Sequence, residues 1–181
     1  MTFQSTIFII PGLGNSEEDH WQSYWERQFG FIRIIQKDWE TPVCADWIET
    51  IDRVVSASKS ESIILVGHSL ACSAIGYWSK RYKRKIKGAL LVGPSDTEAD
   101  TYPLGTEGFS PMPVHTLPFN SLVVASEDDF YVNIERARFF AEKWGSTLIN
   151  IGKAGHINVA SGFGEWDEGL KLLKQLDEAY D

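Results

Sequence analysis

Residues 62–72 read SIILVGHSLAC and join an apolar run to the start of a helical pattern. A sharp turn between a strand and a helix pushes the side chain at its tip into open space, provided that small residues flank it. Gly67 and Ala71 are the small residues here, and Ser69 lies between them. We therefore interpret residues 67–71 as a nucleophile elbow of the form GxSxA, with Ala71 where glycine is usual.

An acid and a histidine follow the serine, in the chain order that this kind of elbow requires. The apolar run at 122–125 leads into Ser-Glu-Asp-Asp at 126–129, and the run at 148–151 leads into Gly-Lys-Ala-Gly-His at 152–156. Each candidate follows the carboxyl end of a predicted strand, where open α/β sheets place their ligands. The sequence therefore predicts that Ser69, an aspartate at 128 or 129, and His156 form one site.

Strands and helices alternate along the chain, with no linker or repeat between them. Apolar runs predict strands at 6–10, 32–36, 62–66 and 87–92, and near residues 122 and 147. Helical periodicity covers 17–29, 45–58, 70–82, 134–144 and 167–180, and a loop rich in proline and glycine occupies 93–120. Continuous apolar strands separated by helices indicate a parallel, doubly wound α/β sheet with helices on both faces. We expect residues 1–181 to form a single domain.

The amino-acid composition disfavours several classes of binding partner. The 17 basic and 25 acidic residues give a formal net charge of −8, which disfavours nucleic acid and anionic membranes as partners. No stretch matches a signal peptide or a membrane span, so we expect a cytoplasmic protein. The two cysteines and four histidines have no metal-binding spacing, and Gly12 to Glu17 matches no nucleotide-binding motif. We therefore expect neither a metal nor a cofactor.

Five motifs, at 10–15, 19–22, 67–69, 125–129 and 154–158, carry a resemblance to a known family. In their order the chain resembles the compact α/β-hydrolases related to retinoblastoma-binding protein nine and their bacterial relatives. The resemblance implies a minimal α/β-hydrolase fold of about six parallel strands without a separate lid domain. It also implies Ser69 as nucleophile, His156 as general base and Asp129 as orienting acid. Phe130 stands where these relatives often carry proline, which leaves Asp128 as the alternative acid.

Acyl transfer needs two preorganised hydrogen-bond donors for the oxyanion. The backbone N–H of Leu70, which follows the nucleophile at the start of a helix, is one candidate. The second is the N–H of Leu13, in the loop after the first strand, where Gly12 lets the backbone approach the substrate.

We also place Gly12, His20 and Trp21 in the substrate-binding site, and Tyr102, Phe109 and Met112 in the wall that binds the acyl group. The predicted activity is hydrolysis of small acyl esters through an acyl-enzyme. Thioesterase and amidase activities use the same triad, and a binding or scaffold protein that keeps the fold is a further alternative.

Overall fold

Parallel strands build the centre of the molecule. The computed structural model describes residues 1–179, and in these residues six strands form one sheet in the order β2-β1-β3-β4-β5-β6. The strands are β1 (Thr6–Ile10), β2 (Ile32–Arg33), β3 (Ile63–His68), β4 (Gly88–Val92), β5 (Asn120–Ala125) and β6 (Thr147–Asn150). All five neighbouring pairs are parallel. The strand order reverses between β1 and β3, so the crevice at their carboxyl ends is where this kind of sheet binds ligands.

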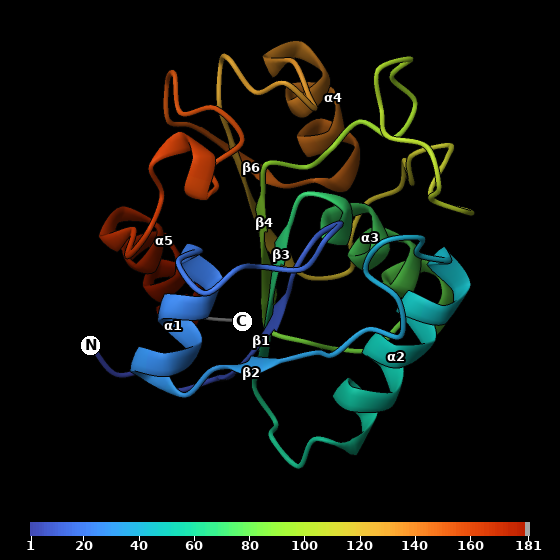
Figure 1. Ribbon diagram of the computed structural model, residues 1–181. Helices are drawn as coiled ribbons and strands as arrows, with labels where there is room; N and C mark the ends of the chain where they lie inside the picture. The colour runs from blue at the N-terminus through green and yellow to red at the C-terminus, as the bar shows by residue number, and fades with distance from the viewer. Residues whose placement is uncertain (180–181) are drawn as a thin grey trace.

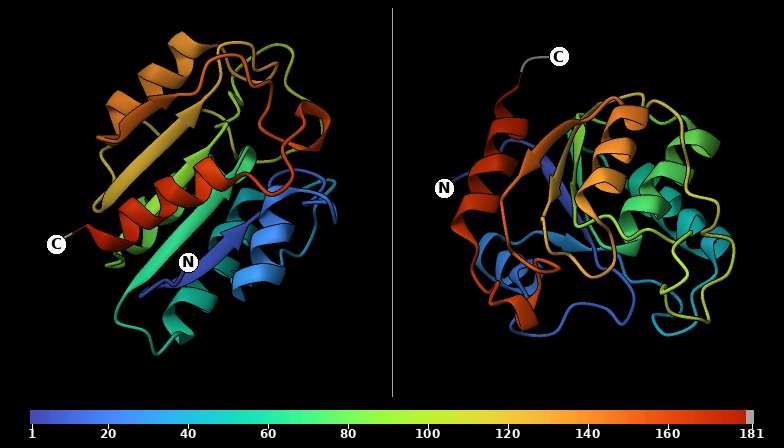
Figure 2. Two further views of the ribbon diagram at one scale, coloured as in Figure 1. Left: turned by 90° about the vertical axis from the view of Figure 1, so that its left-hand side faces the viewer. Right: turned by 90° about the horizontal axis from the view of Figure 1, so that it is seen from above.

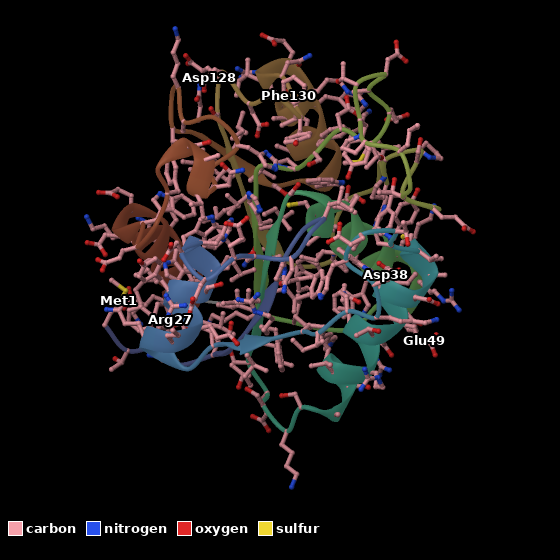
Figure 3. The ribbon with its side chains drawn as sticks, viewed as in Figure 1. Met1, Arg27, Asp38, Glu49, Asp128 and Phe130 are labelled. Atoms are coloured by element: carbon pink, nitrogen blue, oxygen red, sulfur yellow. The ribbon has the colours of Figure 1, made fainter. Side chains whose placement is uncertain are left out.

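Helices cover both faces of the sheet (Figures 1 and 2). Helices α1 (Trp21–Phe29) and α5 (Asp167–Glu178) lie on one face, and α2 (Cys44–Ala57), α3 (Leu70–Tyr82) and α4 (Ile134–Trp144) lie on the other. The charged side chains of Arg27 on α1 and Glu49 on α2 point away from the sheet (Figure 3). The predicted minimal α/β-hydrolase architecture is therefore confirmed.

The strand sequences explain why both faces are covered. Along β1, Ile7 and Ile9 pack with α1 and α5, whereas Phe8 and Ile10 pack with the helices on the opposite face. All six residues of β3 are buried. Alternate side chains of a strand point to opposite faces, so an uninterrupted apolar run has to be buried on both sides.

Two predicted elements differ most from their expected bounds, and one short element was not predicted. Helix α1 begins at Trp21 instead of residue 17, because His20 caps it by accepting a hydrogen bond from the Gln22 amide. Strand β2 has two residues instead of five: its ladder ends at Arg33, and the next residue turns its side chain into the core. A short 3₁₀ helix, η1 (Val159–Ser161), was not predicted.

The last helix ends at Glu178, and the predicted end at residue 180 lies outside the described part of the chain. No helix between residues 1 and 179 is both long enough and apolar enough to span a lipid bilayer.

Candidate active site

The turn at Ser69 has the geometry of a nucleophile elbow. Ser69 lies between β3 and α3 with φ 59° and ψ −123°, a backbone conformation that side-chain-bearing residues rarely adopt. A Cβ atom at Gly67 would lie 2.7 Å from Ile75 Cδ1, so a larger residue there would require the end of the Ile75 side chain to move. The predicted GxSxA turn therefore forms with alanine at position 71.

Ser69, His156 and Asp129 form one hydrogen-bonded chain. His156 Nε2 lies 2.9 Å from Ser69 Oγ, and His156 Nδ1 lies 2.9 Å and 3.0 Å from the two Asp129 carboxylate oxygens. A carboxylate can only accept, so Nδ1 carries the proton and Nε2 is free to accept the Ser69 hydroxyl proton. All three side chains are buried. The three side chains thus lie in contact, in the arrangement by which a base and an orienting acid activate a serine nucleophile.

Asp128 lies beside this chain and has a different set of contacts. Its Oδ1 accepts hydrogen bonds from the Gly155 amide and the Ser126 hydroxyl, both at 2.8 Å. These bonds, the Gly155 amide first, lower the pKa of Asp128. Asp128 and Phe130 both lie at the outer surface, and Phe130 is 72% exposed (Figure 3). Of the two candidate acids, the geometry therefore brings only Asp129 to His156, while Asp128 braces the loop that carries His156.

The loop after β1 packs directly against the nucleophile. A Cβ atom at Gly12 would lie 2.7 Å from Ser69 Cβ and 2.9 Å from the His68 carbonyl oxygen, so glycine is required there. Leu13 lines the pocket, and Leu70 is the first residue of α3, where backbone amides have no partner within the helix. Both predicted oxyanion donors therefore belong to segments that adjoin Ser69.

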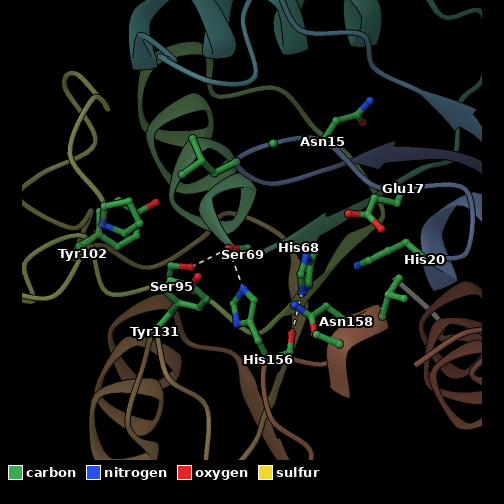
Figure 4. Close-up of a pocket in the computed structure, with 15 residues that line it drawn as sticks. Asn15, Glu17, His20, His68, Ser69, Ser95, Tyr102, Tyr131, His156 and Asn158 are labelled. Carbon is green, nitrogen blue, oxygen red and sulfur yellow. Dashed lines mark hydrogen bonds between the residues drawn. The ribbon is translucent and has the colours of Figure 1, made fainter. Parts of the chain in front are cut away.

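A pocket of about 430 Å³ opens above the nucleophile (Figure 4). Its walls differ in chemistry: Tyr102 and Tyr131 stand on one side of Ser69, and polar residues stand on the other. The polar residues are Asn15, Glu17, His20 and Asn158. The volume lies within the range of small-molecule sites, about 300–1,000 Å³.

Three of the predicted pocket residues lie in the core instead. Trp21 is fully buried against α5, and its indole N–H donates to the Ile157 carbonyl at 2.8 Å. Phe109 and Met112 pack with the helices of the opposite face and do not line the pocket. Large apolar side chains are as useful to a core as to a pocket, so residue type alone did not separate the two roles.

His68 packs against His156, and His20 packs against His68. His68 donates its Nε2 proton to the His156 carbonyl at 2.9 Å, and its ring lies 4.9 Å from that of His20, centroid to centroid. Burial, with the charges of His156 and His20, keeps the pKa of His68 well below its usual range. Burial, with the charges of Arg33 and His156, lowers the pKa of His20 to about 3. Both rings are therefore neutral at physiological pH. Within residues 1–179, no three acidic, cysteine or histidine side chains are grouped to hold a metal.

Sequence reasoning missed Ser95. Its Oγ lies 2.7 Å from Ser69 Oγ, and the residue is 1% exposed. Ser95 follows β4 by three residues, after Gly93, where a Cβ atom would lie 3.4 Å from an Asp129 carboxylate oxygen. The signal that identified the other three residues, a polar side chain just past a strand end, was also present at Ser95 but was not applied there.

Comparisons with known proteins agree with this geometry. The model of the serine hydrolase family matches residues 7–175. A YdeN-like hydrolase from Pectobacterium atrosepticum is 34% identical over 97% of this chain and 91% of its own, with a TM-score of 0.85. The ydeN gene product of Bacillus subtilis is 19% identical over 97% and 100% of the two chains, with a TM-score of 0.81.

The carboxylesterase CesB of Bacillus subtilis shares the fold at 16% identity and a TM-score of 0.68, over 98% of this chain and 85% of its own. Curated proteins give no match. The family match over most of the chain, together with the YdeN-like relative, shows that this protein belongs to the serine hydrolase family and has the compact α/β-hydrolase fold.

Proposed function

We propose that the protein is a carboxylesterase-like enzyme that cleaves small acyl esters through an acyl-enzyme on Ser69. The observation that carries the proposal is the hydrogen-bonded chain from Asp129 through His156 to Ser69 Oγ, in which Ser69 and His156 line an open pocket. The carboxylesterase activity in the name of the structural neighbour CesB agrees with it.

In the first half-reaction, Ser69 Oγ attacks the ester carbonyl carbon, and the hydroxyl proton moves to His156 Nε2. The carbonyl oxygen becomes an oxyanion that accepts hydrogen bonds from the amides of Leu13 and Leu70. Asp129 stabilises the imidazolium and keeps its other nitrogen protonated. The carbon–oxygen bond to the alcohol then breaks, and the alcohol leaves with the proton from His156.

The second half-reaction returns the enzyme to its starting state. Water enters the place of the alcohol, gives a proton to His156 Nε2 and attacks the acyl carbon. The bond between the acyl carbon and Ser69 Oγ breaks, and the oxygen takes the proton back from His156. The carboxylic acid product leaves. Each step reuses the same three side chains and needs no further reactant.

A fluorophosphonate probe tests the proposal, because it reacts with serines activated by a neighbouring base. The probe should label Ser69 and stop hydrolysis of p-nitrophenyl acetate, and Ser69→Ala should lose both properties. Ser73→Ala is the matched control, since Ser73 is a fully buried serine in α3, the helix that follows Ser69. A folded protein that is neither labelled nor hydrolytic would favour the binding or scaffold alternative.

A further inference from the structure

The hydrogen bonds of His20 determine where its proton lies. His20 Nδ1 accepts a hydrogen bond from the Gln22 amide at 3.2 Å, where it caps α1. A nitrogen that accepts carries no proton, and this ring is neutral, as its lowered pKa indicates. A neutral imidazole has one N–H, so the proton of His20 lies on Nε2. His20 therefore presents a fixed hydrogen-bond donor at the far end of its ring.

That donor has no partner in the described protein. His20 is 5% exposed, and its Nε2 atom is buried without any hydrogen-bond partner in residues 1–179. The ring lines the pocket and extends from α1 toward His68, beside the nucleophile (Figure 4). Proteins rarely leave a buried donor unpaired, and a group supplied by a ligand is one way to satisfy it. The donor therefore points to an acceptor that enters with the substrate.

The rest of the pocket fits a substrate with one polar end. Asn15, Glu17 and Asn158 line the pocket on the side of His20, whereas Tyr102 and Tyr131 line the side across Ser69. An ester bound at Ser69 extends toward both sides, because its acyl and alcohol parts leave the carbonyl carbon in different directions. One part therefore meets two tyrosine rings, and the other meets a wall that contains hydrogen-bonding groups together with Val159 and Ala160, which follow Asn158.

We propose that His20 Nε2–H donates a hydrogen bond to an oxygen in the substrate, and that the physiological substrate is an oxygen-substituted ester. The oxygen belongs to an ether, hydroxyl or carbonyl group on one side of the scissile bond, and the other side is apolar. This inference rests on the esterase activity proposed for the same pocket. It adds which chemical class of ester the pocket selects.

Two pairs of isosteric esters test the inference, one for each side of the scissile bond. p-Nitrophenyl methoxyacetate and p-nitrophenyl butyrate differ by one oxygen in the acyl chain. 2-Methoxyethyl acetate and butyl acetate differ by one oxygen in the alcohol. For each pair the ratio of kcat/KM is measured in the wild type and in His20→Asn. Comparing the ratio between the two proteins cancels the intrinsic reactivity of the esters.

His20→Asn removes the donor together with the ring that packs against Trp21 and His68. The Asn side-chain oxygen can replace Nδ1 as the cap of α1, since asparagine is among the best N-cap residues, but no atom replaces Nε2. In one of the pairs, the ratio of kcat/KM for the ether ester to kcat/KM for its hydrocarbon counterpart should be about three- to tenfold lower in His20→Asn than in the wild type. The control Asp19→Asn, an exposed neighbour outside the pocket lining, should keep the wild-type ratios.

Unchanged ratios in both pairs would overturn the inference and leave the proposed esterase activity intact. By contrast, turnover that survives in Ser69→Ala would overturn the activity itself. Nitrogen-15 NMR of the wild-type histidines gives a test that depends on no variant. The spectrum should show His20 protonated at Nε2, and a proton on Nδ1 would overturn the inference.

Discussion

Ser69 has two hydrogen-bond neighbours but only one hydroxyl proton. His156 Nε2 accepts that proton, so the Ser95 hydroxyl, 2.7 Å away, has to donate to Ser69 Oγ. Ser95 thereby holds Ser69 Oγ in the orientation that faces His156 Nε2. We expect Ser95→Ala to lower kcat for p-nitrophenyl acetate about three- to tenfold, the worth of one hydrogen bond.

Ser95→Thr should recover much of the lost kcat, because it restores the hydroxyl. Ser73→Ala should leave kcat unchanged, because the Ser73 hydroxyl is buried and has no partner in residues 1–179. A wild-type kcat in Ser95→Ala would show that His156 alone orients Ser69.

The two adjacent aspartates should differ strongly in their effect on turnover. Asp129→Asn replaces the acceptor for His156 Nδ1–H with an amide, which favours the wrong imidazole tautomer, and kcat should fall about 10⁴-fold. Asp128→Asn keeps an oxygen for the Gly155 amide and should change kcat only a few-fold. The measurement is kcat with one activated ester, with thermal unfolding to check that both variants fold. Equal losses of kcat would mean that the hydrogen bonds of Asp128 to the loop of His156 matter as much as the hydrogen bond between Asp129 and His156.

Among the elements, α5 is held to β1 by one carboxylate. Asp177 of α5 is fully buried and accepts hydrogen bonds at 2.9 Å from the amides of Gln4 and Ser5, just before β1, and at 3.0 Å from Lys174. Burial alone would raise the pKa of Asp177, but these hydrogen bonds together lower it. The stability that Asp177 contributes is therefore fully present above the ordinary aspartate pKa, about 3.9, and is lost as the pH falls below it.

Asp177→Asn should lower the free energy of unfolding at neutral pH by about 1.5–3 kcal/mol. It should also make the decline in stability below about pH 4 shallower. Urea unfolding at several pH values measures both effects. Glu178→Gln is the matched control, because Glu178 contacts the same lysine from an exposed position, where an ion pair contributes about 0–1 kcal/mol. If the free energy of unfolding of Asp177→Asn declined as steeply below about pH 4 as that of the wild type, this role for Asp177 would be contradicted.

The sequence predicted those elements whose signals are local. Helices α3 and α4 have the predicted bounds, because their apolar periodicity and their flanking turns agree. Helix α1 was misjudged at its start, since the cap is a histidine, which is not a typical N-cap residue. Ser69, His156 and the aspartate pair were found because each follows a strand end. Ser95 was missed although it also follows a strand end, and Trp21 was misjudged because core packing depends on contacts between distant segments.

For the whole molecule, the loop between β4 and β5 decides how much of the substrate is covered. Tyr102 and Pro103 of this loop line the pocket, whereas the neighbouring Leu104 is 98% exposed and points away from the core. The loop therefore forms a side wall and leaves the mouth of the pocket open. Acyl carbons beyond the wall stay in water and gain little of the roughly 25 cal/mol per Å² that burial provides.

Turnover should therefore be best for acyl chains of about two to four carbons and should show no activation at a lipid interface. A series of p-nitrophenyl esters from acetate to laurate, compared by kcat/KM, measures the preference. A maximum at eight or more carbons would mean that the loop closes over the site as a lid.

The strained backbone at Ser69 lowers the thermal stability of this protein, while the side chain that it positions is needed for the proposed reaction. A residue held at φ 59° costs about 1–3 kcal/mol, and glycine alone would adopt this conformation freely. The Ser69→Gly variant should therefore have a higher melting temperature than the wild type and no esterase activity. A library screened only for thermal stability would enrich this variant, which lacks the Ser69 hydroxyl. A screen for more stable variants therefore has to measure turnover as well.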